Sequence, residues 1–327
     1  MRNSGCYDTS TILLAACPGR AGAGILAIVK NLPFFIRFGV RFASVFLAAG
    51  IALGPVARGD SPLPAGVPDL LGARALSLGA YRGLAAGNDG IFTNAASLAA
   101  RRRYSLESFW LLDREGSDTA IQVLTASAVD SQTAAVTGGF AFTRVLSGPW
   151  TGNLFHVPIA FPLANSLFFG VTGKYQSLDG PAGNQMRAGN VDASAFWQAS
   201  SLIGVGASAY NLLDTGHRQI QPRAFGAGVS VGDDRRYHIG ADWRGDEHRQ
   251  GKLTHLYAVG GELLLGDAYP VRAGYMKDET RNASYWSAGI GFFTSSGFAM
   301  DLAYRQRFED PTERTVAVAI KLFLLSQ

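Results

Sequence analysis

Two glycine-rich stretches are the parts of the sequence whose residue types could do chemistry. Gly228-Val-Ser230-Val-Gly232 has the G-x-S-x-G pattern of a nucleophilic serine, and GVGASA (204–209) resembles part of a dinucleotide-binding loop. Both chemistries need a helix directly after a strand, since the turn exposes the serine and the helix N-terminus holds the phosphates. Both stretches lie instead in alternating, strand-like sequence, so we interpret them as chance matches.

The histidines offer no better site. None of them forms an i,i+4 helical pair, and no paired cysteines accompany them, which argues against structural zinc; they are His156, His217, His238, His248 and His255. The Asn-Ala-Ser sequence at 282–284 fits a plain loop. The sequence therefore predicts no enzyme, no bound metal and no cofactor.

A set of charged residues is more informative, because its members alternate with apolar residues and would share one face of their strands. Charges of both signs on one face are more typical of an ion-pair network than of an ion-selective pore. The set is Lys174, Asp192, His238, Asp242, Arg244, Glu262, Arg272, Asp301, Arg305 and Lys321.

The elements that carry these charges read as strands with a period of two. In 297–307, for example, Met300 and Leu302 fall on one face and Ala299 and Asp301 on the other. Fourteen such segments follow Arg103, each about ten residues long, the length that a tilted strand needs to cross a membrane. They are 104–113, 118–128, 133–143, 152–162, 165–177, 190–200, 202–212, 222–232, 236–245, 252–265, 268–277, 283–293, 297–307 and 313–325.

The connections between these segments are predicted to alternate in length. Short turns such as 233–235 and 294–296 would lie on one side, and longer loops at 178–189, 213–221 and 246–251 on the other, facing outside the cell. This pattern and the even strand number indicate an all-β, single-chain transmembrane antiparallel barrel. A soluble sandwich would leave most of the apolar faces uncovered, and a propeller or solenoid would need a longer internal repeat.

The basic charge of the chain is concentrated in its first 59 residues. These hold six Lys or Arg and one acid, so the remainder has 23 basic and 24 acidic residues, which argues against nucleic-acid binding. They also hold both cysteines, Cys6 and Cys17. The composition therefore assigns no thiol chemistry to the rest of the chain.

Residues 1–59 read as a leader with a signal peptide. The apolar segment 42–54 is too short to span a bilayer comfortably, and small residues precede an expected cleavage before Asp60. Residues 1–29 look like the product of a start site placed too far upstream. A membrane anchor, or a lipoprotein box ending at Cys17, is the alternative.

Residues 60–103 are predicted to form a hatch inside the barrel at 104–327. A fourteen-stranded barrel encloses more space than its own side chains fill. The stretch GARALSLGAYRGLAAGNDGIFTNAASLAA (72–100) is rich in small residues and in Gly, Asn and Asp, which permit close approach and tight turns.

This stretch resembles the N-terminal signature of the PorV/PorQ-type, FadL-like outer-membrane family, which runs roughly G-x-R-A-x-x-L-G-G, A-x-x-D, N-P-A-x-L. The matching hatch-motif residues are Arg74, Gly79, Asn88, Asp89, Asn94 and Ala96. Tyr210-Asn-Leu and the segment from Gly261 to Tyr275 resemble later family patterns. Ala95 replaces the usual proline, and Ala80-Tyr81 replaces the second glycine, so the hatch sequence departs from the family pattern at these two places.

The resemblance implies fourteen strands, a plugged lumen and a monomer in the outer membrane of a Gram-negative bacterium. It leaves two roles open besides a purely structural barrel. One is passive passage of hydrophobic small molecules. The other is a PorV-type docking or shuttle role for exported proteins. The expected partners are outer-membrane lipids, with hydrophobic small molecules or exported proteins as cargo.

A gap in the wall is predicted between the third and fourth strands. Gly138 and Gly139 stand at the centre of the third segment, and Pro158 stands at the centre of the fourth. Proline cannot donate to the ladder, and glycines favour a bulge, so the hydrogen bonding should break at mid-height. The break is either a bulge that curves the barrel or, as the resemblance implies, a lateral opening with His156 facing inward.

Overall fold

The computed structural model describes residues 70–324, apart from 85–86, 116–118, 217–220, 234–235 and 248–252. The predicted leader, its cleavage site before Asp60 and the first part of the predicted hatch lie outside these residues. His217 and His248 also lie outside them.

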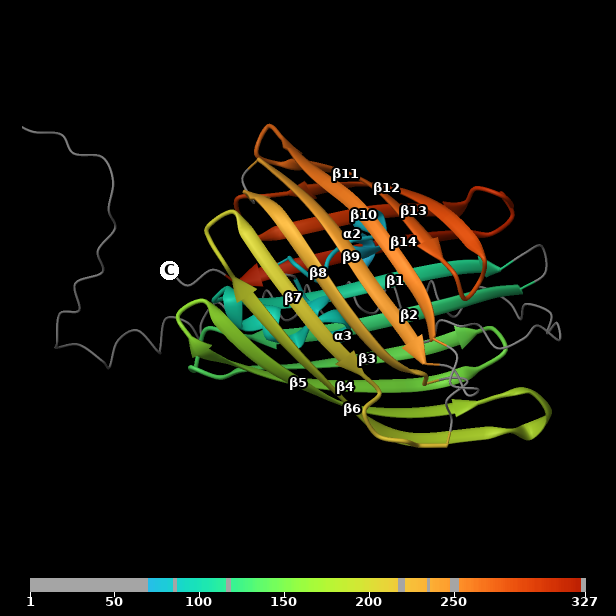
Figure 1. The fold of residues 1–327 in the computed structure, drawn as a ribbon. Helices are drawn as coiled ribbons and strands as arrows, with labels where there is room; N and C mark the ends of the chain where they lie inside the picture. The colour runs from blue at the N-terminus through green and yellow to red at the C-terminus, as the bar shows by residue number, and fades with distance from the viewer. Residues whose placement is uncertain are drawn as a thin grey trace, which may run out of the picture. The chain divides into compact units, whose positions relative to one another are not determined.

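The described residues form a closed barrel of fourteen antiparallel strands, which confirms the predicted fold (Figure 1). Each strand pairs with its sequence neighbours, and β1 pairs with β14 along its whole length. The strands are β1 Tyr104–Glu115, β2 Thr119–Asp130, β3 Thr137–Ser147, β4 Thr151–Ala164, β5 Leu167–Asp179, β6 Gln185–Gln198, β7 Ile203–Tyr210, β8 Arg223–Asp233, β9 Tyr237–Glu247, β10 Leu253–Leu265, β11 Tyr269–Asp278, β12 Ala283–Phe293, β13 Phe298–Arg307 and β14 Arg314–Leu324.

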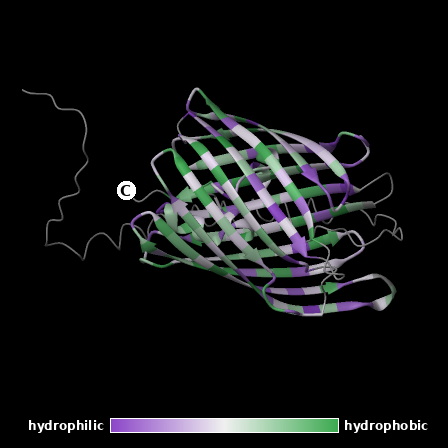
Figure 2. Ribbon diagram, in the orientation of Figure 1, coloured by the Kyte–Doolittle hydropathy of each residue, from purple (hydrophilic) through white to green (hydrophobic). Residues whose placement is uncertain are grey.

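The two faces of the wall differ as the alternation predicts. In β13, Met300 and Leu302 point outward and are 47% and 48% exposed, whereas Ala299 and Asp301 point inward and are almost fully buried. Many large apolar side chains are exposed on the outer face, and hydrophobic and hydrophilic residues alternate along the strands (Figure 2). Closure leaves no strand edge exposed, so the backbone groups of the wall are satisfied within the sheet.

Most strand boundaries lie within about two residues of the predicted ones, and the larger differences are at β3 and at the start of β6. β3 starts at Thr137 instead of residue 133, because the carboxylate of Asp130 accepts hydrogen bonds from the backbone N–H groups of Gln132 and Thr133 and forms a turn there. Gly138 and Gly139 therefore lie at the start of β3, so their predicted central position was wrong.

The loop predicted at 178–189 is also mostly strand. β5 and β6 stay paired as far as Asp179 and Gln185, which leaves only residues 180–184 as the connection. The longest connection on that side of the barrel is 211–222, between β7 and β8.

Inside the barrel lies the hatch, which consists of α2 (Ala73–Leu78), α3 (Gly90–Thr93) and the 3₁₀ helix η1 (Ala95–Ala100) (Figure 1). α2 packs against β10–β14, and η1 packs against β4–β6. α2 ends at Gly79, whose φ of +69° suits glycine. Within the described part of the chain, no helix has both the length and the apolar character needed to cross a bilayer.

A row of inward-facing glycines in the wall receives the hatch backbone. A Cβ at Gly206 would lie 1.8 Å from the carbonyl oxygen of Arg82, and one at Gly260 would lie 1.8 Å from that of Leu78. Gly170 is equally close to the backbone of η1, where a Cβ would lie 2.4 Å from the nitrogen of Ala96. The high glycine content thus has a packing reason, since any side chain at these positions would push the hatch away.

Candidate functional site

The candidate site is the hatch-filled lumen, and Asp242 of β9 is its principal anchor. The Asp242 carboxylate accepts hydrogen bonds from the backbone N–H groups of Tyr81 (2.9 Å) and Arg82 (3.0 Å). It also pairs with the Arg82 guanidinium at 3.2 Å, and both side chains are almost fully buried. A buried charge with several charge-assisted hydrogen bonds fixes the hatch backbone against this strand.

The asparagine and aspartate of the hatch motif hold the two ends of the hatch. Asp89 accepts a hydrogen bond from the backbone N–H of Gly72 at 2.8 Å, inside the hatch itself. Asn88 donates to Ser127 of β2 at 3.0 Å and accepts from Ser105 of β1 at 2.6 Å. These bonds tie the first strands of the barrel to the hatch.

The last hatch segment is held by β6. The side-chain amide of Asn94 donates to the carbonyl oxygens of Arg82 and Ala195, both at 3.2 Å. The backbone N–H of Ala96 donates to the hydroxyl of Ser194 at 3.0 Å. Asn94 therefore links two parts of the hatch to the wall.

Several inward charges form a connected series of buried ion pairs along the inner face of the wall. Arg74 of α2 pairs with Glu262 of β10 at 2.8 Å, and Glu262 also pairs with Arg272 of β11 at 2.5 Å. Arg272 then pairs with Asp301 of β13 at 2.6 Å. Burial lowers the pKa of Arg74, but the attraction and hydrogen bond of Glu262, together with the charges of Asp301 and Asp89, outweigh burial and raise it, so Arg74 is firmly charged.

The series of ion pairs continues across the seam where the barrel closes. Lys321 of β14 lies 3.2 Å from Asp301 and 3.5 Å from Glu107 of β1, which is its direct partner in the register. Sequence reasoning missed Glu107, although it lies two residues from Ser105 and from Phe109 and so shares their inward face of the strand. It also missed Arg82, which lies in the small-residue stretch of the hatch, where no periodic pattern marks it.

The remaining predicted lumen charges form smaller groups. Lys174 pairs with Asp192 at 2.7 Å, and Arg244 pairs with Asp246 at 2.7 Å. Arg305 donates to Thr315 at 3.1 Å and lies over the ring of Tyr285. His238 is buried on the inner face of β9.

Ser230, the serine of the G-x-S-x-G pattern, has a structural role. It lies in the middle of β8, and its hydroxyl donates to the carbonyl oxygen of Gly83 in the hatch. Ser208 and Ser287 make similar bonds from other strands to the carbonyl oxygens of Thr93 and Ser77. Inward serines thus serve the carbonyl groups that the irregular hatch leaves unpaired.

The ladder between β3 and β4 is interrupted. Thr137 and Gly138 of β3 pair with residues of β4, and pairing resumes at Ala141. Between them, Gly139 and Phe140 lie opposite Pro158 and Val157 without a ladder pair. The register is the same on both sides of the gap. The β2–β3 ladder continues past it through Gly139. Gly139 is the third residue of β3, whereas Pro158 lies at the centre of β4, so the break adjoins the start of one strand and the middle of the other.

The strands remain close at this break. A Cβ at Gly139 would lie 3.0 Å from the ring of Pro158, so the two inward residues nearly touch. Gly138 points outward into open space. His156 points inward, where its ring packs edge-on against Phe92 of the hatch at 5.0 Å between centroids.

A small cavity lies between the hatch and the wall beside His156. Its volume, measured as the space open to the centre of a water molecule, is about 30 Å³. Both the hatch and the strands contribute apolar and polar groups to it. Its lining includes Leu71, Arg82, Phe92, His156, Lys174, Gln176, Asp192, Gln221, Pro222, Ala224 and Arg244.

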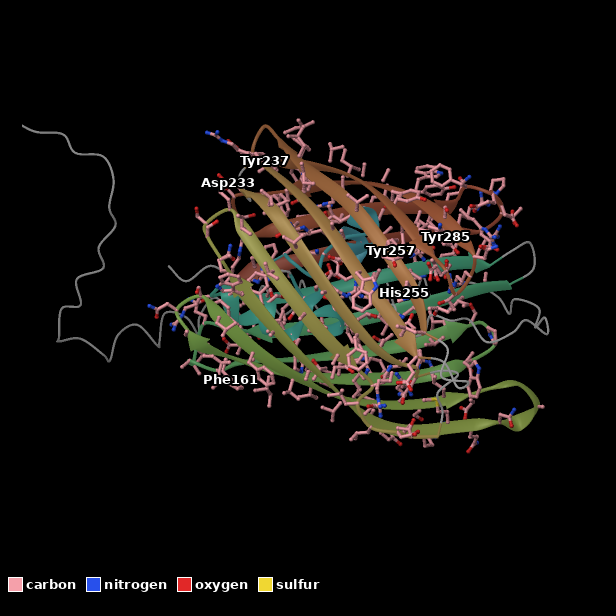
Figure 3. The ribbon with its side chains drawn as sticks, in the orientation of Figure 1. Phe161, Asp233, Tyr237, His255, Tyr257 and Tyr285 are labelled. Carbon is pink, nitrogen blue, oxygen red and sulfur yellow. The ribbon has the colours of Figure 1, made fainter. Side chains whose placement is uncertain are left out.

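Aromatic side chains gather near both ends of the barrel wall. Phe161 packs on Phe169 (5.7 Å between centroids) towards the end where β1 begins, and Tyr237 lies at that end too (Figure 3). Tyr257 and His255 lie towards the other end, where His255 also packs on the ring of Trp243. Two aromatic bands flanking an apolar belt are typical of transmembrane barrels.

Comparison with known proteins identifies similar folds but no related sequences. Neither a family model nor a curated protein sequence matches the chain. The solved structures that resemble it include the Ralstonia pickettii toluene transporter TbuX (TM-score 0.57, 11% identity) and a Pseudomonas aeruginosa FadL homologue (0.56, 11%). Each of these alignments covers 77% of this chain and 97% of the other.

The CymD monoaromatic hydrocarbon channel is similar as well, with a TM-score of 0.55, 12% identity, and coverage of 77% of this chain and 96% of that one. This chain therefore shares the fold of FadL-like barrels. The PorV/PorQ part of the resemblance stays a prediction.

Proposed function

We propose that this protein is an outer-membrane channel through which hydrophobic small molecules pass passively. The shared fold, the apolar outer belt and the two aromatic bands support this proposal. The observation that carries it is the interrupted β3–β4 ladder beside a blocked lumen. The same proposal includes residence in the outer membrane of a Gram-negative bacterium as a monomer, after cleavage before Asp60.

The blocked lumen argues against a straight path through the barrel. Cavities known to hold benzene have volumes of about 150 Å³, against about 30 Å³ here. The buried ion pairs hold the hatch in place, and breaking one of them costs about 3–5 kcal/mol. An apolar molecule therefore needs another route out of the lumen.

The β3–β4 break provides such a route at low energetic cost. Separating a paired stretch of wall in lipid leaves backbone groups unsatisfied at several kcal/mol each, whereas the ladder is already absent opposite Pro158. The outer side of the break is apolar, with Phe140, Val157 and Ile159 each about half exposed. An apolar ligand leaving here would pass directly into the hydrocarbon of the membrane.

The test is to repair the ladder with Gly138→Val, Gly139→Thr and Pro158→Val together. Removing the proline restores an N–H donor and removes one of the two atoms nearest to a Cβ at 139, so that side chain then needs only a small adjustment away from the carbonyl oxygen of Ala128. We expect toluene uptake by proteoliposomes to fall toward that of protein-free vesicles. A matched control makes the same three exchanges at Gly173, Gly189 and Pro162, where the two glycines have room for a side chain.

Folding of both variants is checked by the different gel mobility of unboiled and boiled samples, which barrels of this type show. If the repaired barrel folds and takes up toluene as fast as the control, the break is not the route. N-terminal sequencing of the mature protein tests the cleavage site separately.

A further inference from the structure

Three buried polar atoms without a hydrogen-bond partner line the same cavity. They are Nδ1 of His156, Oε1 of Gln176 and Nε2 of Gln221. The exposed fractions of the three residues are 5%, 3% and 4%, so bulk water does not satisfy these atoms. Native proteins rarely leave buried donors and acceptors unpaired, and such groups point to a bound partner.

The charges around this cavity are balanced. Lys174, Arg82 and Arg244 are each paired with a carboxylate of the wall, at distances between 2.7 and 3.2 Å. An anionic ligand would meet these carboxylates without an unpaired cation to offset them. The cavity therefore suits a neutral polar group.

Apolar side chains line another part of the cavity, beside the polar groups of Tyr81, Thr93, Tyr210 and Asn211. Leu71 and Phe92 come from the hatch, and Pro222 and Ala224 come from β8 and the loop before it. A ligand that fits this lining carries one small polar group on a hydrophobic body. The cavity volume of about 30 Å³ admits only the polar group and the atoms next to it, since one water needs roughly 10–15 Å³ by this measure.

We propose that the cavity is a subsite for the hydroxyl group of a phenol or aromatic alcohol, so that the channel prefers such molecules to the corresponding hydrocarbon. This inference rests on the proposed function and narrows its substrate class. A hydroxyl group donates one hydrogen bond and accepts others. It would donate to Oε1 of Gln176 and accept from Nε2 of Gln221, whereas the methyl group of a hydrocarbon would leave both atoms unpaired.

The test compares p-cresol with toluene, which differ by one hydroxyl group. Binding of each radiolabelled probe is measured by equilibrium dialysis against the full-length mature protein in lipid nanodiscs, with empty discs subtracted. We expect the wild type to bind p-cresol roughly tenfold more tightly than toluene. Gln176→Leu should reduce that preference to about twofold or less.

Gln185→Leu is the matched control, because it is the same exchange at an exposed position of β6, outside the cavity. It should leave the preference unchanged. Gln221→Leu is the second test variant, used if Gln176→Leu fails to show the heat-dependent gel mobility of a folded barrel.

The two levels of inference fail separately. Equal wild-type binding of both probes, or a preference that survives Gln176→Leu and Gln221→Leu, overturns the subsite even if toluene still crosses the membrane. Absence of toluene and p-cresol uptake together with a retained p-cresol preference overturns the channel and leaves the subsite standing.

Discussion

Replacing Gly206 by alanine should dislodge the hatch without disrupting the barrel wall. The new Cβ would lie 1.8 Å from the carbonyl oxygen of Arg82, where real contacts are rarely closer than 3.0 Å. The hatch backbone must therefore move by at least about 1.2 Å, the difference between these distances. Such a shift disturbs the 3.0 Å bond from the Arg82 N–H to Asp242, whose geometry tolerates only a few tenths of an ångström.

The energetic effect follows from this overlap. Overpacking of one methyl group costs about 1–3 kcal/mol. A value of about 2 kcal/mol raises the population of the displaced hatch roughly 30-fold, since 1.4 kcal/mol corresponds to a factor of ten.

A single introduced thiol can measure this population. Ser97 of η1 is fully buried, and the chain from Asp60 onward contains no cysteine. In the Ser97→Cys background, Gly206→Ala should raise the rate of maleimide labelling roughly 30-fold. Gly173→Ala is the control, because a Cβ at Gly173 meets no atom within 4 Å. Equal labelling rates in the two variants would refute the close seating of the hatch on β7.

Three further predictions test the anchors and the orientation. Asp242→Asn keeps the side-chain size but removes the charge that Arg82 pairs with, so unfolding in urea should be easier by about 2 kcal/mol; unchanged stability would show that this anchor is dispensable. Lys321→Met leaves Glu107 and Asp301 without their shared cation, so it should cost about 3–5 kcal/mol in the same assay, with partial recovery on adding Glu107→Gln; a double variant as unstable as the single one would contradict that coupling. An epitope inserted at 308–313 should be reached by antibody on intact cells and one at 294–297 should not; the opposite labelling would reverse the orientation.

The sequence predicted the barrel because each strand faces two different solvents. Successive residues such as Met300 and Asp301 face apolar and polar surroundings in turn, and their residue types are apolar and polar accordingly. Strand number and the facing of each side chain follow from it. The same logic placed Arg272 and Lys321 on the inner face, where the structure has them.

The strand ends were harder to predict, since a ladder can continue where the contrast in hydrophobicity stops. Around the β5–β6 connection, polar side chains such as Asp179 and Arg187 point outward, so the apolar alternation ends before the pairing does. Before β3, the side chain of Asp130 stabilises a turn that delays the start of the strand.

The arrangement of the hatch could not be derived from the sequence for a different reason. Asn94 bonds to Ala195, and Arg82 pairs with Asp242, 160 residues further along the chain. No local pattern encodes such partners, and the resemblance supplied motif residues without their contacts. The cavity atoms of Gln176 and Gln221 gave no sequence signal for the same reason.

The ion pair between Glu107 and Lys321 has a consequence for biogenesis. The two residues face each other across the β1–β14 seam, so they meet only when the first and last strands of the chain come together. Lys321 also contacts Asp301, which connects through Arg272 and Glu262 to Arg74 of the hatch. A nascent chain whose seam is still open leaves Glu107 without its cation. A chain that closes without its hatch leaves Glu262 with one cation instead of two. Pairing of β14 with β1 and packing of the hatch into the barrel should therefore occur together during insertion.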